Sequence, residues 1–140
     1  MTLTLKAPLL PVRSQIAALE AAMMASDDQI HIEPAHYFAR GLYARGVTLP
    51  AGSTAVGHIH AQEHICIVSK GRALVVSEAG VTEVEAPCTM IIPAGRKNCV
   101  HAIEETVWTT IHATETRDIA ALESELLLPD YPDEVRPCLS

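Results

Sequence analysis

The stretch GSTAVGHIHAQEHICIVSKG, from Gly52 to Gly71, contains three of the seven histidines of the chain, His58, His60 and His64. Residues two apart on a strand point to the same face, so the spacing predicts that His58 and His60 share a face. A turn is predicted at residues 61–62, after which His64 begins the next apolar run. Two antiparallel neighbours joined in this way aim three imidazoles at one point.

Three imidazoles aimed at one point are typical of a metal site. Imidazole is a ligand for Zn, Fe, Cu and Ni, and three protein ligands beside an open position are typical of catalytic zinc. The stretch therefore predicts a metal site formed by His58, His60 and His64, in preference to three solvated histidines at the rim of a fold.

The rest of the chain predicts an all-β protein, because short apolar or alternating runs recur at intervals of about ten residues. Turns are expected where Gly and Pro separate these runs. The predicted strands are 29–33, 36–40, 42–49, 54–60, 63–69, 72–77, 81–86, 89–92, 98–103 and 106–112.

A helix is predicted on each side of the strands. The first is expected at Ser14–Met24 with Ser14 as its N-cap, and the second at Arg117–Leu127 with Thr116 as its N-cap. At 140 residues the chain is expected to be a single domain. Its parts are an N-terminal arm and helix at 1–28, a barrel at about 30–112, and a C-terminal helix and tail at 113–140.

Composition narrows the classes of partner. The formal net charge is −7 and aromatic residues make up 4% of the chain, which argues against nucleic acid as a partner. No apolar run approaches the roughly 20 residues that span a bilayer, and the N-terminal residues do not have the pattern of a signal peptide. No C-x-x-C spacing occurs among the four cysteines. We therefore expect a cytoplasmic protein with free thiols.

The opening stretch resembles the first motif of the cupin superfamily, G-x5-H-x-H-x3,4-E-x6-G. Gly52, His58, His60 and Gly71 occupy its glycine and histidine positions, whereas its glutamate position is His64. The resemblance implies a jelly-roll β-barrel with a divalent transition metal (Fe, Ni, Zn, Mn or Co) in its mouth.

The second cupin motif, G-x5-P-x-G-x2-H-x3-N, is half present. Pro93-Ala94-Gly95 matches its P-x-G, but Pro87 stands at its first glycine and Asn98 at its histidine. Asn98 is therefore expected to line the cavity in place of a fourth ligand. His101 is the alternative, although its strand parity puts it on the other face.

Other candidates are weighed against structural roles. Cys66 has the strand parity of His64 and is expected to line the cavity or to be a buried core thiol. Glu63 has the opposite parity and is expected to face away. Three arginines could bind an anionic substrate, and for each of them the alternative is a solvated charge at the edge of a strand. They are Arg40, Arg45 and Arg96. The histidines predicted to be at the surface or at an interface are His31, His36 and His112, with a supporting role behind the ligands as the alternative for the last.

Two functions remain open. The first is a small-molecule metalloenzyme, with a dioxygenase as the first guess because three-histidine iron sites occur among cupin dioxygenases. The second is a non-catalytic cupin that binds a small ligand or serves as an accessory or structural protein. The segments 36–45, 85–88 and 106–112 resemble small cupin-like proteins of phages and prophages. The second function is favoured because position 98 lacks the histidine and position 64 lacks the glutamate of the cupin motifs, and because few polar residues are candidates for acid–base work. Family analogy also implies a homodimer.

Overall fold

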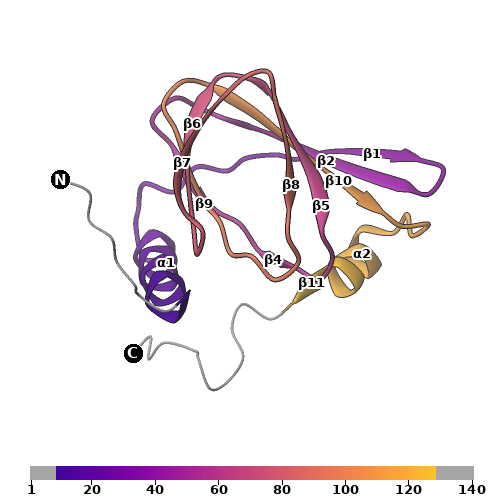
Figure 1. Ribbon diagram of the computed structural model, residues 1–140, viewed down its shortest axis with the longest axis horizontal. Coiled ribbons are helices and arrows are strands. Elements are labelled where there is room, and N and C mark those ends of the chain that lie inside the picture. The colour runs from indigo at the N-terminus through magenta and orange to yellow at the C-terminus, as the bar shows by residue number, and fades with distance from the viewer. Residues whose placement is uncertain (1–8, 129–140) are drawn as a thin grey trace.

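The computed structural model of the protein describes residues 9–128. Within them lie two helices and three antiparallel sheets, and the two larger sheets face each other as a jelly-roll sandwich (Figure 1). The five-stranded sheet has the order β1 (Ala35–Ala39), β2 (Leu42–Leu49), β10 (Thr106–Ala113), β5 (His64–Lys70) and β8 (Cys88–Ile92).

The second sheet has four strands and the third has two. The four-stranded sheet has the order β3 (Thr54–Val56), β9 (Cys99–Ala102), β6 (Arg72–Ser77) and β7 (Gly80–Glu85). The two-stranded sheet pairs β11 (Leu127–Leu128) with β4 (Ile59–His60). The all-β jelly-roll fold predicted from the sequence is therefore confirmed.

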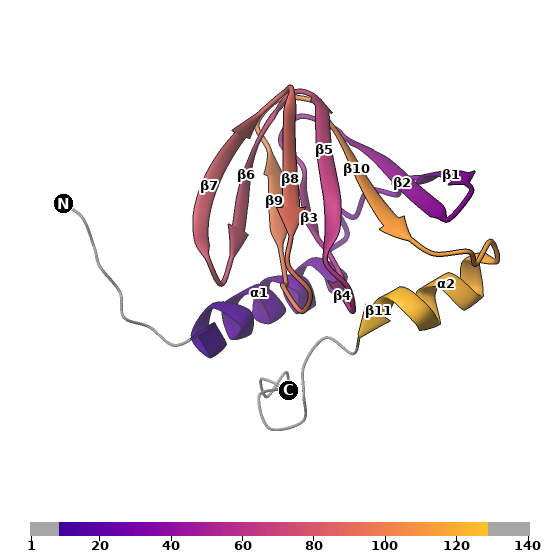
Figure 2. The same cartoon turned by 45° about the vertical axis from the view of Figure 1, so that its right-hand side comes forward.

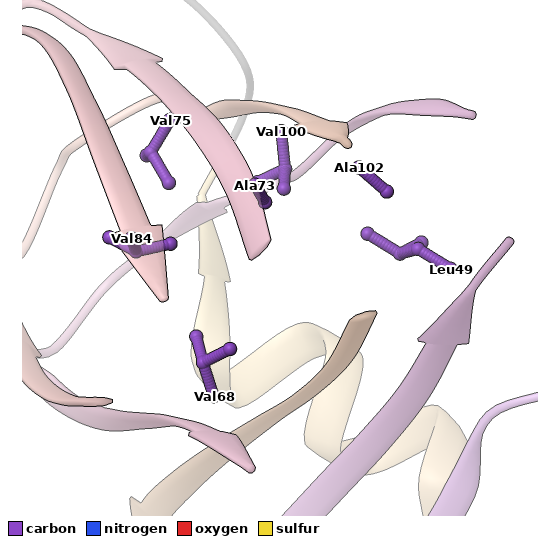
Figure 3. Packing of buried hydrophobic residues seen from close by; sticks show 7 residues of the cluster. All are labelled: Leu49, Val68, Ala73, Val75, Val84, Val100 and Ala102. Atoms are coloured by element: carbon purple, nitrogen blue, oxygen red, sulfur yellow. The ribbon is translucent and has the colours of Figure 1, made fainter. Parts of the chain in front are cut away.

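The core lies between the two larger sheets, where alternating residues of each strand point inward. The strand β6 shows the pattern most clearly, because every second residue is buried. Figure 3 shows the side chains that meet in this core, which are Leu49, Val68, Ala73, Val75, Val84, Val100 and Ala102. All seven are aliphatic, so burial of apolar surface stabilises the contact between the sheets.

Three strand predictions need correction. Residues 29–33 do not form a strand, although their pattern alternates. The strand predicted at 54–60 is interrupted at Gly57 and His58, which separate β3 from β4. The strand β11 was not predicted, because the helical period was expected to continue through Leu127.

The N-terminal helix α1 (Leu9–Met24) begins five residues before the predicted N-cap, Ser14. Pro11 lies in its first turn, where the missing N–H has no intrahelical partner to lose, so proline does not delay the helix. Ile16 and Ala17 are buried. The Lys97 ammonium, which is fully buried, lies 3.4 Å from a carboxylate oxygen of Glu20 and ties α1 to the segment before β9.

The C-terminal helix α2 (Ile119–Leu126) is shorter than predicted. Its N-cap is Asp118 rather than Thr116, because the Asp118 carboxylate accepts a hydrogen bond from the Ala121 N–H at 2.9 Å. Leu122 and Leu126 pack against Tyr43 on β2. Figure 2 shows α2 beside the lower end of β10, with β11 continuing toward β4.

An extended arm was expected at residues 1–13, but residues 9–13 belong to α1. Residues 1–8 of the expected arm and the expected coil at 129–140 lie outside the described residues. Between residues 9 and 128, no helix has both the length and the apolar character that a membrane crossing requires.

Candidate functional site

A cavity of about 350 Å³ opens between the sheets beside α2. Its deeper wall is apolar and includes Leu49, Val100 and Trp108. Its polar lining is dominated by five of the seven histidines, which are His36, His58, His60, His64 and His112. An apolar wall with a few convergent polar groups is typical of a small-molecule site.

Strand register explains how His64 and His112 meet. Ile111 on β10 pairs with Ile65 on β5 in an antiparallel register, so position 112 on β10 lies opposite position 64 on β5. Those residues are His112 and His64, and both are buried, at 3% and 6% exposure. Because β10 is the central strand of its sheet, His112 is held on both sides, with Tyr43 of β2 as its other partner.

His60 reaches the same point from the two-stranded sheet. It is paired with Leu127, and the neighbouring Ala61 N–H donates a 2.7 Å hydrogen bond to the Leu126 carbonyl. The end of α2 and the strand β11 therefore hold β4 over the cavity. From the other side, the Gly95 N–H donates a 2.9 Å hydrogen bond to the His60 carbonyl, so β4 is fixed by two neighbouring segments.

The three rings touch one another. Ring centroids are 4.4 Å apart for His60 and His64, 4.6 Å for His64 and His112, and 4.9 Å for His60 and His112. Each imidazole therefore contacts the other two, and together they form a triangle at one end of the cavity. We call these three residues the histidine triangle.

Burial keeps the histidine triangle neutral. Desolvation first, and then the charges of His64, His112, His58 and Arg45, together lower the pKa of His60 to about 3. Desolvation followed by the charge of His64 lowers the pKa of His112 to about 4. Desolvation also lowers the pKa of His64, although its hydrogen bond to Gln62 opposes the change. Each ring consequently keeps one nitrogen lone pair available near neutral pH.

Hydrogen bonds assign one of these lone pairs. The Nδ1 of His64 lies 3.2 Å from the carbonyl oxygen of Gln62. A carbonyl oxygen only accepts, so Nδ1 carries the hydrogen and Nε2 carries the lone pair. A backbone carbonyl behind a ring nitrogen is the usual support of a metal-binding histidine. The Nε2 of His112 is paired with the Thr110 hydroxyl at 3.1 Å, which leaves its Nδ1 free of that contact.

The ring spacing suits a metal. Three imidazoles bound at roughly 2.0–2.1 Å to one ion place their centroids roughly 4.5–5.2 Å apart, and the observed separations reach from just below that range into it. As the rings stand, no three His, Cys, Asp or Glu side chains within residues 9–128 are positioned to hold an ion. The three residue types and the distances between their rings fit a divalent transition metal. To bind one, the three imidazoles would have to rotate so that each directs a nitrogen at a common point.

His58 is placed differently from its predicted partners. It follows the break at Gly57, so it does not share a strand with His60, and its side chain is exposed. It lines the cavity and is close enough to lower the pKa of His60, but it lies outside the histidine triangle. Its role as a ligand stays a prediction.

Asn98 lines the cavity, and its backbone carbonyl accepts a 3.0 Å hydrogen bond from the Gly57 N–H. Its side-chain Oδ1 is buried and has no hydrogen-bond partner among the described residues. Buried polar atoms of this kind normally bond to protein, water or a ligand. His101 instead bonds the Thr54 hydroxyl at 2.8 Å on the far side of β9.

Cys66 lies deeper in the core than the cavity wall. It is fully buried, and desolvation raises the pKa of its thiol to about 12, so it stays protonated. The expectation that it lines the cavity is therefore replaced by its alternative, a buried core thiol. Glu63 is exposed and lies outside the cavity lining, as its strand parity predicted.

Arg45 is the one cation, and Glu123 of α2 the one carboxylate, of the described residues that line the cavity. Arg45 stands opposite Thr110 in the sheet and faces inward with Tyr43. The Tyr43 hydroxyl is hydrogen-bonded to His36 Nδ1 at 2.7 Å. Arg40 and Arg96, the other two candidate anion-binding residues, do not line this cavity.

The prediction that His112 lies at the surface is wrong. Trp108, Thr110 and His112 occur at alternate positions of one strand and all three line the cavity. That alternation was visible in the sequence, but it does not say which of the two faces is inside. The missing information was the pairing of β10 with β5.

No model of a known protein family matches the sequence, and no curated protein matches it. Solved structures are similar to it in fold. A cupin superfamily protein of Desulfitobacterium hafniense has 10% identity, with 82% of this chain and 97% of that chain covered and a TM-score of 0.52. A cupin-2 domain containing protein of Shewanella frigidimarina has 14% identity, with 69% and 92% covered and a TM-score of 0.50.

A eukaryotic protein gives a similar result. The Cnp3 cupin domain of Schizosaccharomyces pombe has 19% identity, with 71% of this chain and 77% of that chain covered and a TM-score of 0.52. At these identities the likeness concerns the fold alone. The protein is thus a small cupin-fold protein whose cavity carries a histidine triangle.

Proposed function

We propose that this protein binds a divalent transition metal through His60, His64 and His112 and takes a small molecule into the cavity beside it. The observation that carries the proposal is the mutual contact of three neutral imidazoles inside a cavity. Imidazole is a good ligand for Fe, Ni, Zn and Co. Manganese prefers oxygen ligands, so it is the least favoured of the metals considered.

A purely structural role explains the histidine triangle less well than metal binding does. Packing three imidazoles together buries polar nitrogens, and each buried nitrogen without a partner costs free energy. A core position at His112 would be filled more stably by an apolar residue. A metal ion bound by all three rings would instead coordinate one nitrogen of each, so each of those nitrogens would have a partner.

When bound, such a metal supplies a Lewis acid or an activator of O2 or water. Oxygenation of the small molecule is our first proposal for the reaction, on the ground that three-histidine iron sites occur among cupin dioxygenases. The chain's own residues hold the metal, exclude water with the apolar wall, and orient the bound molecule. The Arg45 guanidinium would bind an anionic group of the small molecule. The side-chain oxygen of Asn98, which has no partner among the described residues, would accept a hydrogen bond from a hydroxyl or amino group.

The second candidate is a non-catalytic cupin, either a small-ligand binding protein or an accessory protein of the phage type. One observation favours it. Glu123 is the one carboxylate among the described lining residues. The cavity therefore offers few groups for acid–base work. The free thiols Cys66, Cys88 and Cys99 support a cytoplasmic location for either function.

The deciding experiment measures the metal content of protein purified without an affinity tag. Metal close to one equivalent is expected in the wild type, and less than a tenth of that in the double variant His60→Ala/His64→Ala. His101→Ala is the matched control, because that histidine lies outside the cavity and should leave the metal content unchanged. Wild type without metal, even after incubation with Fe, Zn, Ni or Co, would exclude the first proposal and leave the second.

A further inference from the structure

The cavity has a polar mouth and an apolar pocket. Its exposed lining residues mark the mouth, and they are His36, Arg45, Gly57, His58, Ile119 and Glu123. Five lining residues that lie in the core between the two larger sheets, or pack against it, form what we call the apolar pocket: Val47, Leu49, Ala55, Val100 and Trp108. A ligand that fills the cavity therefore meets charged and polar groups at one end and apolar side chains at the other.

Strand register places Arg45 between the histidine triangle and the apolar pocket. The cavity-lining positions of β10 are His112, Thr110 and Trp108 in turn. Arg45 on β2 is the cross-strand partner of Thr110. Val47 is the partner of Trp108. Alternate positions on a strand are about 6.6 Å apart, so Arg45 is one such step from the rings and one step from the pocket.

Arg45 is available to a ligand. It lies between His36 on β1 and Thr110 on β10, and none of the ion pairs within residues 9–128 includes it. A guanidinium binds a carboxylate through two parallel hydrogen bonds. Burial is the main cause of the lowered pKa of His60 and His112, and the charge of Arg45 contributes to both. An anion on Arg45 would therefore lie close to the histidine triangle.

The mouth suits a single negative charge. Glu123 of α2 is its one carboxylate among the described lining residues. Burial is the main cause of the raised pKa of Tyr43, which the charge of Arg45 lowers and the charge of Glu123 raises, so both charges are close to this side chain. A dianion such as a phosphate ester would be repelled by Glu123, whereas one carboxylate would be balanced by Arg45.

We propose that the small molecule of this cavity is an amphiphilic monocarboxylate, with its carboxylate on Arg45 at the mouth and its apolar tail in the apolar pocket beside Trp108. The inference rests on the proposed function, because it names the molecule that the cavity takes. The carboxylate lies next to the histidine triangle and the tail extends away from it, so a bound metal would meet the carboxylate end of the ligand.

The test is a series of straight-chain monocarboxylates from butanoate to decanoate, titrated in chelator with the fluorescence of Trp108 as the signal. Affinity should rise about fourfold for each added methylene until the tail fills the pocket. The alcohol of the same length should bind roughly tenfold more weakly or worse, because it lacks the charge-assisted hydrogen bonds. Affinity that does not depend on tail length, or equal affinity for acid and alcohol, would overturn the inference.

The variant Ala55→Leu tests where the tail lies. Ala55 pairs with Val100 and lines the apolar pocket, so a larger side chain should move the preferred ligand to a shorter chain and leave butanoate binding within about twofold. Ala39→Leu is the matched control, because Ala39 is exposed and outside the cavity lining, and it should keep the wild-type preference. An unchanged preference in Ala55→Leu would place the tail elsewhere and overturn the inference.

If Ala55→Leu does not fold, Val47→Ala replaces it. This change enlarges the apolar pocket and should move the preference to a longer chain, and an unchanged preference would again overturn the inference. The metal content of the same preparations separates this result from the metal proposal. Protein that binds metal but shows no dependence on tail length would overturn the ligand class alone. Protein that shows the dependence but binds no metal would support the ligand class and contradict the metal proposal.

Discussion

The ring of His112 on β10 stacks on the ring of His60 on β4, with centroids 4.9 Å apart and ring planes 20° apart. The two residues come from different sheets, and β4 is held by its pairing with β11 at the end of α2 and by the Gly95 N–H, which donates a 2.9 Å hydrogen bond to the His60 carbonyl. The C-terminal helix therefore contributes to the site without supplying a histidine. It sets the position of His60 relative to the rings on the large sheet.

Metal-free protein should lose stability in mild acid. Desolvation lowers the pKa of His112 to about 4 and that of His60 to about 3, while both have a pKa of about 6.5 when unfolded. Between these values the unfolded chain binds more protons, so stability is retained above pH 6.5 and falls as the pH decreases toward the folded pKa. From pH 6.5 to 5 the loss is about 2 kcal/mol for one such histidine. Urea unfolding in chelator at both pH values measures it, and equal stabilities would contradict the burial of these rings.

Gly71, the last residue of the first motif, should not tolerate a side chain. Its φ is +91°, and an added Cβ would collide with the carbonyl oxygen of Glu105 and lie 2.7 Å from the Thr106 hydroxyl oxygen. We expect Gly71→Ala to cost about 3 kcal/mol or more, from backbone strain together with the collision. Gly52→Ala is the control, because its φ is +82° with open space around it, and it should cost only about 1–2 kcal/mol. Similar losses for the two variants would mean that the collision is relieved by movement of the chain.

Small carboxylates should bind the cavity through Arg45. Trp108 lines the cavity and is the only tryptophan of the chain, so its fluorescence reports binding directly. In chelator, a short-chain carboxylate should bind more tightly than the corresponding amide, and Arg45→Gln should weaken the carboxylate about tenfold or more, as expected for a charge-assisted hydrogen bond.

Arg40→Gln serves as the control for this measurement, because Arg40 does not line the cavity. If carboxylate and amide bind equally well to the wild type, Arg45 does not select the ligand. The metal proposal would be unaffected by that result, since the titration is made without metal.

The substitution Asn98→His should strengthen metal binding. Asn98 lines the same cavity as the histidine triangle and occupies the position where the second cupin motif has its histidine. Imidazole suits these metals better than an amide, and one gained ligand should raise affinity at least tenfold, or about 1.4 kcal/mol. A competition titration with a chelator measures the change. Unchanged affinity would mean that position 98 does not reach the metal.

The sequence was sufficient for the fold and for two members of the histidine triangle. Strand-length runs with turns at regular intervals predicted an all-β protein, and the resemblance to the first cupin motif implied the jelly roll. The spacing of His60 and His64 across a turn predicted their approach. The third member depended on distant pairing. His112 faces inward only because β10 lies between β2 and β5, and parity alone allows either face.

His58 failed to join its neighbours for a local reason. The prediction required one unbroken strand from 54 to 60, but β3 ends at Val56 and β4 begins at Ile59. The Gly57 N–H still bonds the Asn98 carbonyl in register with the β3–β9 pairing, and the chain turns away from β9 after that bond. A glycine within a strand pattern often marks such an interruption. The N-cap of α2 was predicted two residues too early, because Asp118 and Thr116 are both good caps by residue type.

The most direct test of the metal proposal compares zinc affinity in wild type, His112→Phe and His58→Phe by competition with a chelator, after the fold of each variant has been verified. Phenylalanine keeps the aromatic stacking of the site and removes the nitrogen. We predict at least a tenfold loss of affinity for His112→Phe, because it removes one of three ligands, and a much smaller loss for His58→Phe. Full affinity in His112→Phe, together with a large loss in His58→Phe, would contradict the histidine triangle and restore the ligand set of His58, His60 and His64.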